Sequence, residues 1–214
     1  MPFILLTFLV IELSLLFYIS RQSINSLYFS LRSIVQNDKV VYSIIAFLFF
    51  PGTIIHELSH FLIAILLLHK VRAIHIFPVF EKNHIRLGRV IYEKKDALRS
   101  ILVGIAPVIV GIMIFWWIST LDIFFIQNLW LKTLIIYLIF IVSTTMFLSK
   151  ADLIDFGYVL PIGVVLVVGF LNNSQLIAML SDFVYDVNVY LGISIIIHTI
   201  LLVVFFTFKK ITTH

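Results

Sequence analysis

Long apolar runs separated by short polar segments dominate the pattern of this chain. About six windows hold roughly 20 mostly apolar residues each, the length of a helix that crosses about 30 Å of hydrocarbon. These windows cover residues 3–20, 40–69, 97–118, 129–148, 153–171 and 189–208. Because we find no internal repeat or flexible linker, we expect one all-α polytopic membrane domain over residues 1–214, with about six transmembrane helices.

The second window is longer than a simple span requires. About 30 helical residues measure about 45 Å, against roughly 30 Å for the hydrocarbon core. Pro51 and Gly52 can interrupt this window. Either the helix is kinked and tilted there, or residues 40–50 form a separate segment that lies at the membrane or dips into it.

The segment after the second window is polar and patterned differently. Residues 74–76 and 85–87 alternate apolar with polar side chains, and residues 81–83 between them have the composition of a turn. We therefore expect a short β-hairpin over about residues 71–92. In the third window, residues 104–107 (Gly-Ile-Ala-Pro) and Gly111 predict close approach of another helix.

Composition and charge agree with the membrane class. Of the 214 residues, 62% are hydrophobic and only 12% are charged. The first window lacks a preceding basic residue and a small-x-small cleavage site, so we expect a retained helix. In a chain of this kind the formal charge of +4 does not indicate nucleic acid; the positions of Lys and Arg indicate orientation instead.

The basic residues favour one orientation in an integral, multi-pass membrane protein. With the N-terminus inside, four basic residues lie in outer segments, Arg21, Arg32, Lys39 and Lys132. The other eleven of the 15 lie in inner segments: Lys70, Arg72, Lys82, Arg86, Arg89, Lys94, Lys95, Arg99, Lys150, Lys209 and Lys210. This excess predicts that both termini are cytoplasmic.

One motif carries the chemistry. Residues 56–60 read His-Glu-Leu-Ser-His inside an apolar stretch, which is an HExxH motif. On a helix, residues four apart lie on one face, so the imidazoles of His56 and His60 can reach one metal ion, with Glu57 beside it as a general base. The alternative is a hydrogen-bonded polar cluster, but three ionisable groups in an apolar helix cost several kcal/mol, usually borne for function.

The remaining ligand candidates are few. The chain has no cysteine, so any metal is held by imidazole and carboxylate. A hydrolytic zinc site needs a third protein ligand. The candidates in or near the membrane are Glu12, Asp152, Asp155 and His198, with His69, His75 and His84 in the adjacent polar loop.

The two aspartates lie at the junction of the fourth and fifth windows, on the inner side by the charge pattern, as does the end of the second window. Depth alone favours Asp155, about 4.5 Å further along a helix that starts near Asp152. We expect Glu12 to make an interhelical hydrogen bond and His198 to be a satisfied packing histidine. We expect His75 and His84 to be solvated or at the hairpin edge.

Several segments together resemble the site-two protease family of intramembrane zinc metalloproteases, as a divergent member. They are the HExxH motif after residues 50–53 (Phe-Pro-Gly-Thr), the polar hairpin, residues 104–107, and residues 146–152 (Met-Phe-Leu-Ser-Lys-Ala-Asp). The resemblance covers about residues 45–160. It implies that Asp152 is the third zinc ligand beside His56 and His60, although Thr144 stands where the family has Asn and Leu148 where one version has Pro.

The resemblance implies a zinc metalloendopeptidase that cleaves transmembrane protein substrates within or at the edge of the bilayer, with Glu57 as the catalytic base. The hairpin would hold the unwound substrate by edge pairing, as in the family. Two alternatives remain open. One is a metalloprotease with its catalytic domain beside the membrane, whose third ligand would be Glu81 or Glu93; the other is a non-proteolytic metal-binding protein, a transporter or an inactive relative that binds membrane partners.

Overall fold

The computed structural model describes residues 2–77, 79–81, 84–86, 88–93, 96–121, 123–147 and 174–212. Within these ranges lie five helices, α1 (Pro2–Ile34), α2 (Asp38–Leu66), α3 (Ala97–Ser119), α4 (Leu129–Thr145) and α6 (Ser174–Thr212). Four short strands follow α2: β1 (Val71–His75), β2 (Val79–Glu81), β3 (His84–Arg86) and β4 (Arg89–Tyr92).

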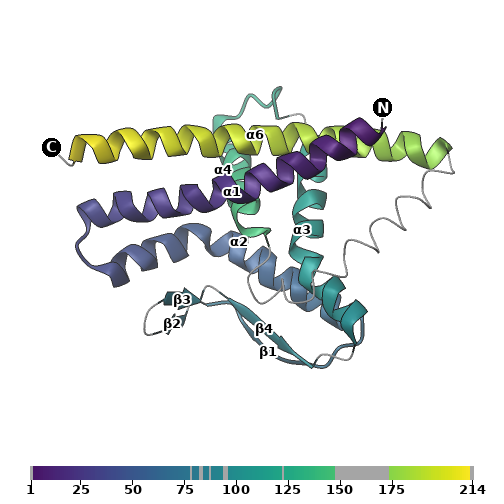
Figure 1. Ribbon diagram of the computed structural model, residues 1–214, viewed down its shortest axis with the longest axis horizontal. Helices are drawn as coiled ribbons and strands as arrows, with labels where there is room; N and C mark the ends of the chain where they lie inside the picture. The colour runs from purple at the N-terminus through teal and green to yellow at the C-terminus, as the bar shows by residue number, and fades with distance from the viewer. Residues whose placement is uncertain are drawn as a thin grey trace.

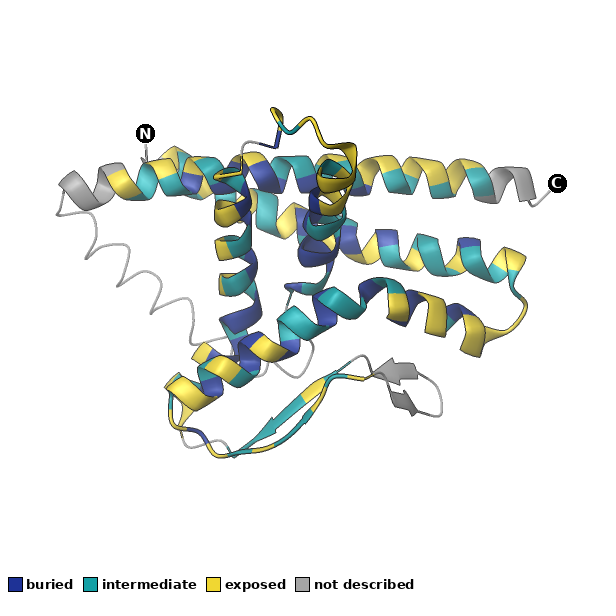
Figure 2. Ribbon diagram, turned by 180° about the vertical axis from the view of Figure 1, so that it is seen from behind, coloured by how far each residue is buried: buried dark blue, intermediate teal, exposed yellow. Residues whose placement is uncertain are grey.

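The helices form a crossed arrangement rather than a simple up-and-down bundle. Figure 1 shows α1 and α6 side by side, α3 and α4 running across them, and the strands on the far side of α2. Buried residues gather in the middle of the molecule, where α3 and α4 meet the other helices (Figure 2). Each helix contributes to this core, for example Leu16, Phe49, Phe115, Ile139 and Leu191.

Four of the described helices are long and apolar enough to cross a membrane, namely α1, α2, α3 and α6. The 17 residues of α4 are equally apolar but measure only about 25 Å as a helix. This agrees with the predicted helical membrane class, with four candidate spans in the described residues where about six were expected. The predicted span at residues 153–171 lies outside the described residues.

The first helix is longer than the apolar window predicted. It was expected to end near residue 20, yet α1 continues to Ile34 and carries Arg21 and Arg32 on the helix rather than in a loop. Residues 21–34 contain no proline or glycine, and Ile24, Leu27 and Leu31 recur at helical spacing and pack against the core. An amphipathic helix therefore extends the apolar one.

The second helix runs through its proline without a break. Pro51 lies inside α2, so residues 40–50 belong to the same helix as the HExxH motif and are not a separate segment. A helix proline donates no backbone hydrogen bond, which weakens the preceding turn. In that turn the carbonyl of Leu48 accepts a hydrogen bond from the hydroxyl of Tyr137 on α4, at 2.7 Å.

The predicted hairpin is present, but it pairs in two ladders. Antiparallel β1 and β4 place His75 opposite Arg89, and antiparallel β2 and β3 place Glu81 opposite His84. Residues 74–76 overlap β1 and residues 85–87 overlap β3, so the two alternating segments belong to different ladders of this hairpin.

The two longest helices run in the same direction. Asn188 on α6 donates to the carbonyl of Leu5 at 3.0 Å, and further along both helices His198 meets Ser23. Two parallel helices that both cross a bilayer carry the chain termini to opposite faces, whereas the charge pattern predicts both termini inside. The location of the termini therefore stays a prediction.

Candidate metal centre

The two histidines of the HExxH motif meet on one face of α2. The Nε2 atoms of His56 and His60 are 3.2 Å apart, and their rings are nearly perpendicular, at 83°. Glu57 is buried between α2 and the strands, and His60 is buried as well. The spacing of four residues thus brings the imidazoles together as the sequence predicts.

Backbone carbonyls of two other helices fix the orientation of both rings. His56 Nδ1 donates to the carbonyl of Thr145 at 2.6 Å, and His60 Nδ1 donates to the carbonyl of Val103 at 2.7 Å. A carbonyl oxygen can only accept, so each Nδ1 carries a hydrogen. In neutral imidazoles the two facing Nε2 atoms therefore both present lone pairs.

Both carbonyls can accept a side-chain hydrogen bond because each lacks a backbone N–H partner within its own helix. Thr145 is the last residue of α4, where carbonyls have no partner within the helix. Val103 lies four residues before Pro107, inside α3, and the proline has no N–H to give to it. The same proline that loosens α3 thus provides the acceptor that holds His60.

The facing nitrogens fit a tetrahedral metal ion. Two lone pairs 3.2 Å apart repel each other unless a proton or a cation lies between them. Two nitrogens that bind zinc at about 2.05 Å with a tetrahedral angle are about 3.3 Å apart. Metal-binding histidines typically donate their other ring N–H to a carbonyl or carboxylate, as His56 and His60 do.

Two glycines allow α4 to end beside His56. A Cβ at Gly52 of α2 would lie 2.6 Å from Thr145 Oγ1 and 3.2 Å from the carbonyl oxygen of Ile141. A Cβ at Gly111 of α3 would lie 2.8 Å from the Cβ of Met146. The predicted close approach at Gly111 is confirmed, and the approach at Gly52 brings the Thr145 carbonyl to the His56 ring.

A third glycine lies against the carboxyl group of the motif. A Cβ at Gly88, directly before β4, would lie 2.5 Å from Cγ and 2.6 Å from Oε1 of Glu57. The hairpin is further held to α2 by the stacked rings of Phe50 and Phe77, whose centroids are 5.6 Å apart. The hairpin backbone therefore covers Glu57, and only glycine leaves room for this contact.

Both aspartates that the sequence nominates as a third ligand lie outside the part of the chain that the structure describes. Among the described residues, no group of three His, Asp or Glu side chains could hold a metal ion together. Asp152 and Asp155, the two predicted candidates, fall outside the described residues, and so does the side chain of His84. The described residues thus bring two candidate ligands together, His56 and His60, and a third is nominated by the sequence alone.

The other predicted candidates lie apart from the two imidazoles. His69 Nδ1 donates to the carbonyl of Glu93 at the base of the hairpin, and His75 is exposed on β1. Glu93, one of the two carboxylates that a juxtamembrane metalloprotease could use, is paired with Arg72 at 2.7 Å, and the side chain of the other, Glu81, lies outside the described residues. Buried Oε2 of Glu12 has no hydrogen-bond partner among the described residues, so the expected interhelical bond is not seen at that atom.

His198 is the satisfied buried histidine that was expected. It is completely buried on α6, with Nδ1 3.0 Å from Ser23 Oγ of α1 and Nε2 3.0 Å from Ser143 Oγ of α4. Its hydrogen bonds thus join three helices.

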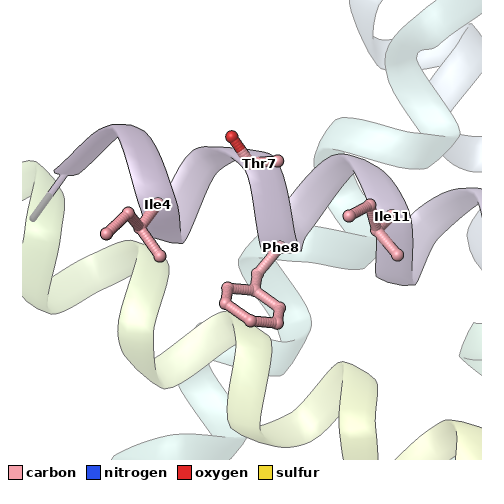
Figure 3. Close-up of a pocket in the computed structure, with 4 residues that line it drawn as sticks. All are labelled: Ile4, Thr7, Phe8 and Ile11. Atoms are coloured by element: carbon pink, nitrogen blue, oxygen red, sulfur yellow. The ribbon is translucent and has the colours of Figure 1, made fainter.

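A surface hollow on α1 is lined almost entirely by apolar side chains and holds no candidate metal ligand. It has a volume of about 240 Å³ and lies on one face of α1, lined by Ile4, Thr7, Phe8 and Ile11 (Figure 3). Apart from the Thr7 hydroxyl, these side chains carry no polar group.

Sequence reasoning identified the motif but missed the groups that support it. The acceptor role of Val103 could have been suspected, because a proline inside a helix always frees the carbonyl four residues earlier. Nothing in the sequence indicates that His60 uses this carbonyl, or that Gly88 meets Glu57. Comparison with protein-family models, with curated proteins and with solved structures finds no match.

Proposed function

We propose that this chain is an intramembrane zinc metalloprotease that hydrolyses peptide bonds of membrane-spanning substrates. The observation that carries the proposal is the pair of Nε2 atoms 3.2 Å apart, each ring held through Nδ1 by a backbone carbonyl. A buried carboxyl group on the adjacent residue, Glu57, completes the arrangement expected of an HExxH hydrolase.

Asp152 is our proposed third ligand. Support comes from the resemblance in residues 146–152 and from chain length, since seven residues after Thr145 reach at most about 25 Å from a carbonyl that already touches His56. Asp155 is within reach by the same argument and is the alternative. Two imidazoles and one carboxylate leave a fourth position open for water or substrate.

When bound, zinc lowers the pKa of a coordinated water toward about 7 and polarises the scissile carbonyl. Glu57 then accepts the proton of the attacking water and passes it to the leaving amine. Burial of Glu57 beneath Gly88 keeps bulk water away and fixes the direction of its carboxyl group. His56 and His60 keep their Nε2 atoms directed at the metal because their Nδ1 hydrogens are engaged.

The substrate class follows from where the motif lies. Helix α2 is apolar enough to cross a membrane, so the motif lies within a candidate membrane span. A transmembrane helix hides its amides in internal hydrogen bonds and must unwind before water can attack. We propose that the unwound segment pairs with a free edge of the hairpin beside Glu57. The protein would be a multi-pass membrane protein with the hairpin on the cytoplasmic side, where most of the basic residues lie.

The test is cleavage in liposomes. Purified protein is reconstituted with a single-span test substrate whose helix is weakened by Gly and Pro and tagged at both ends. The proposal expects products cut within or next to the span by the wild type, and none by Glu57→Gln. Equal cleavage by Glu57→Gln would overturn the catalytic assignment. Zn²⁺ flux that survives Glu57→Gln, without cleavage by the wild type, would favour transport.

A further inference from the structure

The buried His198 of α6 contacts both α1 and α4, close to the end of α4 that meets His56. Its ring is 0% exposed, its two nitrogens contact hydroxyl groups of α1 and α4, and it lies within the candidate span Met179–Phe208. Thr144 Oγ1 of α4 is also near, 3.5 Å from Nε2. A histidine whose task were only to fill space would be replaced at lower cost by an apolar side chain.

The hydrogen bonds around the ring are complete when the ring is neutral. Nδ1–H can donate to Ser23, whose hydroxyl has the carbonyl of Ile19 as its own acceptor at 3.1 Å. Ser143 can then donate to Nε2, while Thr144 donates to the carbonyl of Phe140 at 2.6 Å. With the other tautomer the two serine bonds reverse and remain satisfied, so His198 ties α1, α4 and α6 together in either form.

The segment of α4 that His198 holds is the one that orients His56. Ser143 and Thr144 directly precede Thr145, whose carbonyl accepts the His56 Nδ1 hydrogen at 2.6 Å. Thr145 is also fixed from the α2 side, by its close contact with Gly52. The last turn of α4 is therefore clamped between His198 and the metal-motif helix.

We propose that His198 is a positioning residue for the metal centre: through Ser143 and Thr144 it sets the place of the Thr145 carbonyl and hence the direction of the His56 ring. The inference rests on the proposed metal site. It predicts that a change in the packing of α6 and α1 against α4 changes the zinc affinity of the site on α2. Mutation of a group that orients a metal-binding histidine typically lowers metal affinity 10- to 100-fold. His198 acts through the end of α4 rather than on His56 directly, so we expect a loss of about 10-fold.

The test measures the Zn²⁺ dissociation constant of detergent-purified full-length protein by competition with a chelator, alongside thermal unfolding. His198→Phe should weaken Zn²⁺ binding about 10-fold. His198→Gln, whose amide can reach the position of Nε2, should restore most of the affinity, whereas His198→Asn, whose amide mimics Nδ1, should not. The double variant Ser143→Ala/Thr144→Val removes the same link from the α4 side and should reproduce His198→Phe.

The matched control is Ser194→Ala. Ser194 is as buried as His198 and lies one turn away on α6, but among the described residues its hydroxyl bonds only within that helix, to the carbonyl of Tyr190 at 2.8 Å. It should leave Zn²⁺ affinity unchanged. Wild-type affinity in both His198→Phe and the α4 double variant would overturn the inference while leaving the metal site intact. Absence of Zn²⁺ binding by the wild type would instead overturn the proposed function on which it rests.

Discussion

At the scale of single residues, the site depends on which atoms are left without a helical partner. The carbonyls of Thr145 and Val103 are free because one ends a helix and the other precedes a proline by four residues. Each engages the Nδ1 of one histidine and directs Nε2 to the proposed metal ion. Tautomer control of this kind raises affinity without adding a ligand.

Pro107→Ala tests this control. The new N–H of residue 107 would share the Val103 carbonyl with His60, so Zn²⁺ affinity should fall about 10-fold. Alanine is a far better helix former than proline, so thermal stability should not fall. Chelator competition and thermal unfolding in detergent measure the two effects separately.

The control for this variant is Pro51→Ala. Pro51 also lies inside a helix, but the carbonyl it frees, that of Phe47, belongs to a residue that is 84% exposed. Zn²⁺ affinity should stay at the wild-type value. An equal loss of affinity in both variants would show that the effect comes from the helices rather than from the Val103 carbonyl.

At the scale of elements, the hairpin and the motif helix form one unit. Stacking of Phe50 on Phe77 holds the hairpin on α2, and Gly88 brings its backbone against Glu57. The base of the hairpin is closed by the bond from His69 Nδ1 to the carbonyl of Glu93. The hairpin predicted from the sequence is thus a cover for the carboxyl group of Glu57.

Gly88→Ala separates catalysis from metal binding. The added Cβ would occupy the space of Glu57 Cγ, 2.5 Å away, and must displace the carboxyl group. Because a general base contributes 10²- to 10⁴-fold, we expect cleavage of the liposome substrate to fall about 100-fold, with Zn²⁺ content unchanged. Gly192→Ala is the matched control, since its Cβ would meet Glu12 Oε1 at an ordinary 3.8 Å. Full activity of Gly88→Ala would contradict the assigned contact.

Sequence patterns predicted some of the helices and strands and missed part of one helix. Apolar windows predicted α3 within a residue or two, and alternation predicted a hairpin, because burial in lipid or on one face of a strand leaves a local signature. The same windows missed residues 21–34 of α1, where the helix continues as an amphipathic one. The pairing of β1 with β4 agrees with a hairpin over residues 71–92, in which the first and last residues face each other.

The candidate site divides in the same way. His56, Glu57 and His60 were predictable because their spacing on one helix is a local property. The supporting atoms of Thr145 and Val103, which lie 89 and 43 residues from the histidines they hold, depend on how helices cross. Their choice could not be derived from the order of residues alone.

At the scale of the whole molecule, the charge pattern and the helix directions predict different locations for the chain termini. The basic residues predict the hairpin and both termini inside, while α1 and α6 run parallel. Because the natural chain has no cysteine, single cysteines report orientation cleanly.

With the hairpin inside, His75→Cys should be protected from a membrane-impermeant maleimide in intact cells. Phe125→Cys, in the segment between α3 and α4 where the side chain is 83% exposed, should be labelled. The reverse pattern would overturn the predicted orientation, and cysteines added at each terminus locate the two ends independently.

The central claim is that the facing imidazoles of α2 form a metal site, and zinc per chain in detergent-purified protein tests it most directly. We predict one zinc ion per chain in the wild type and in Glu57→Gln, whose base is not a ligand. We predict loss of zinc in the His56→Ala/His60→Ala double variant. Stoichiometric zinc retained by that double variant would contradict the account.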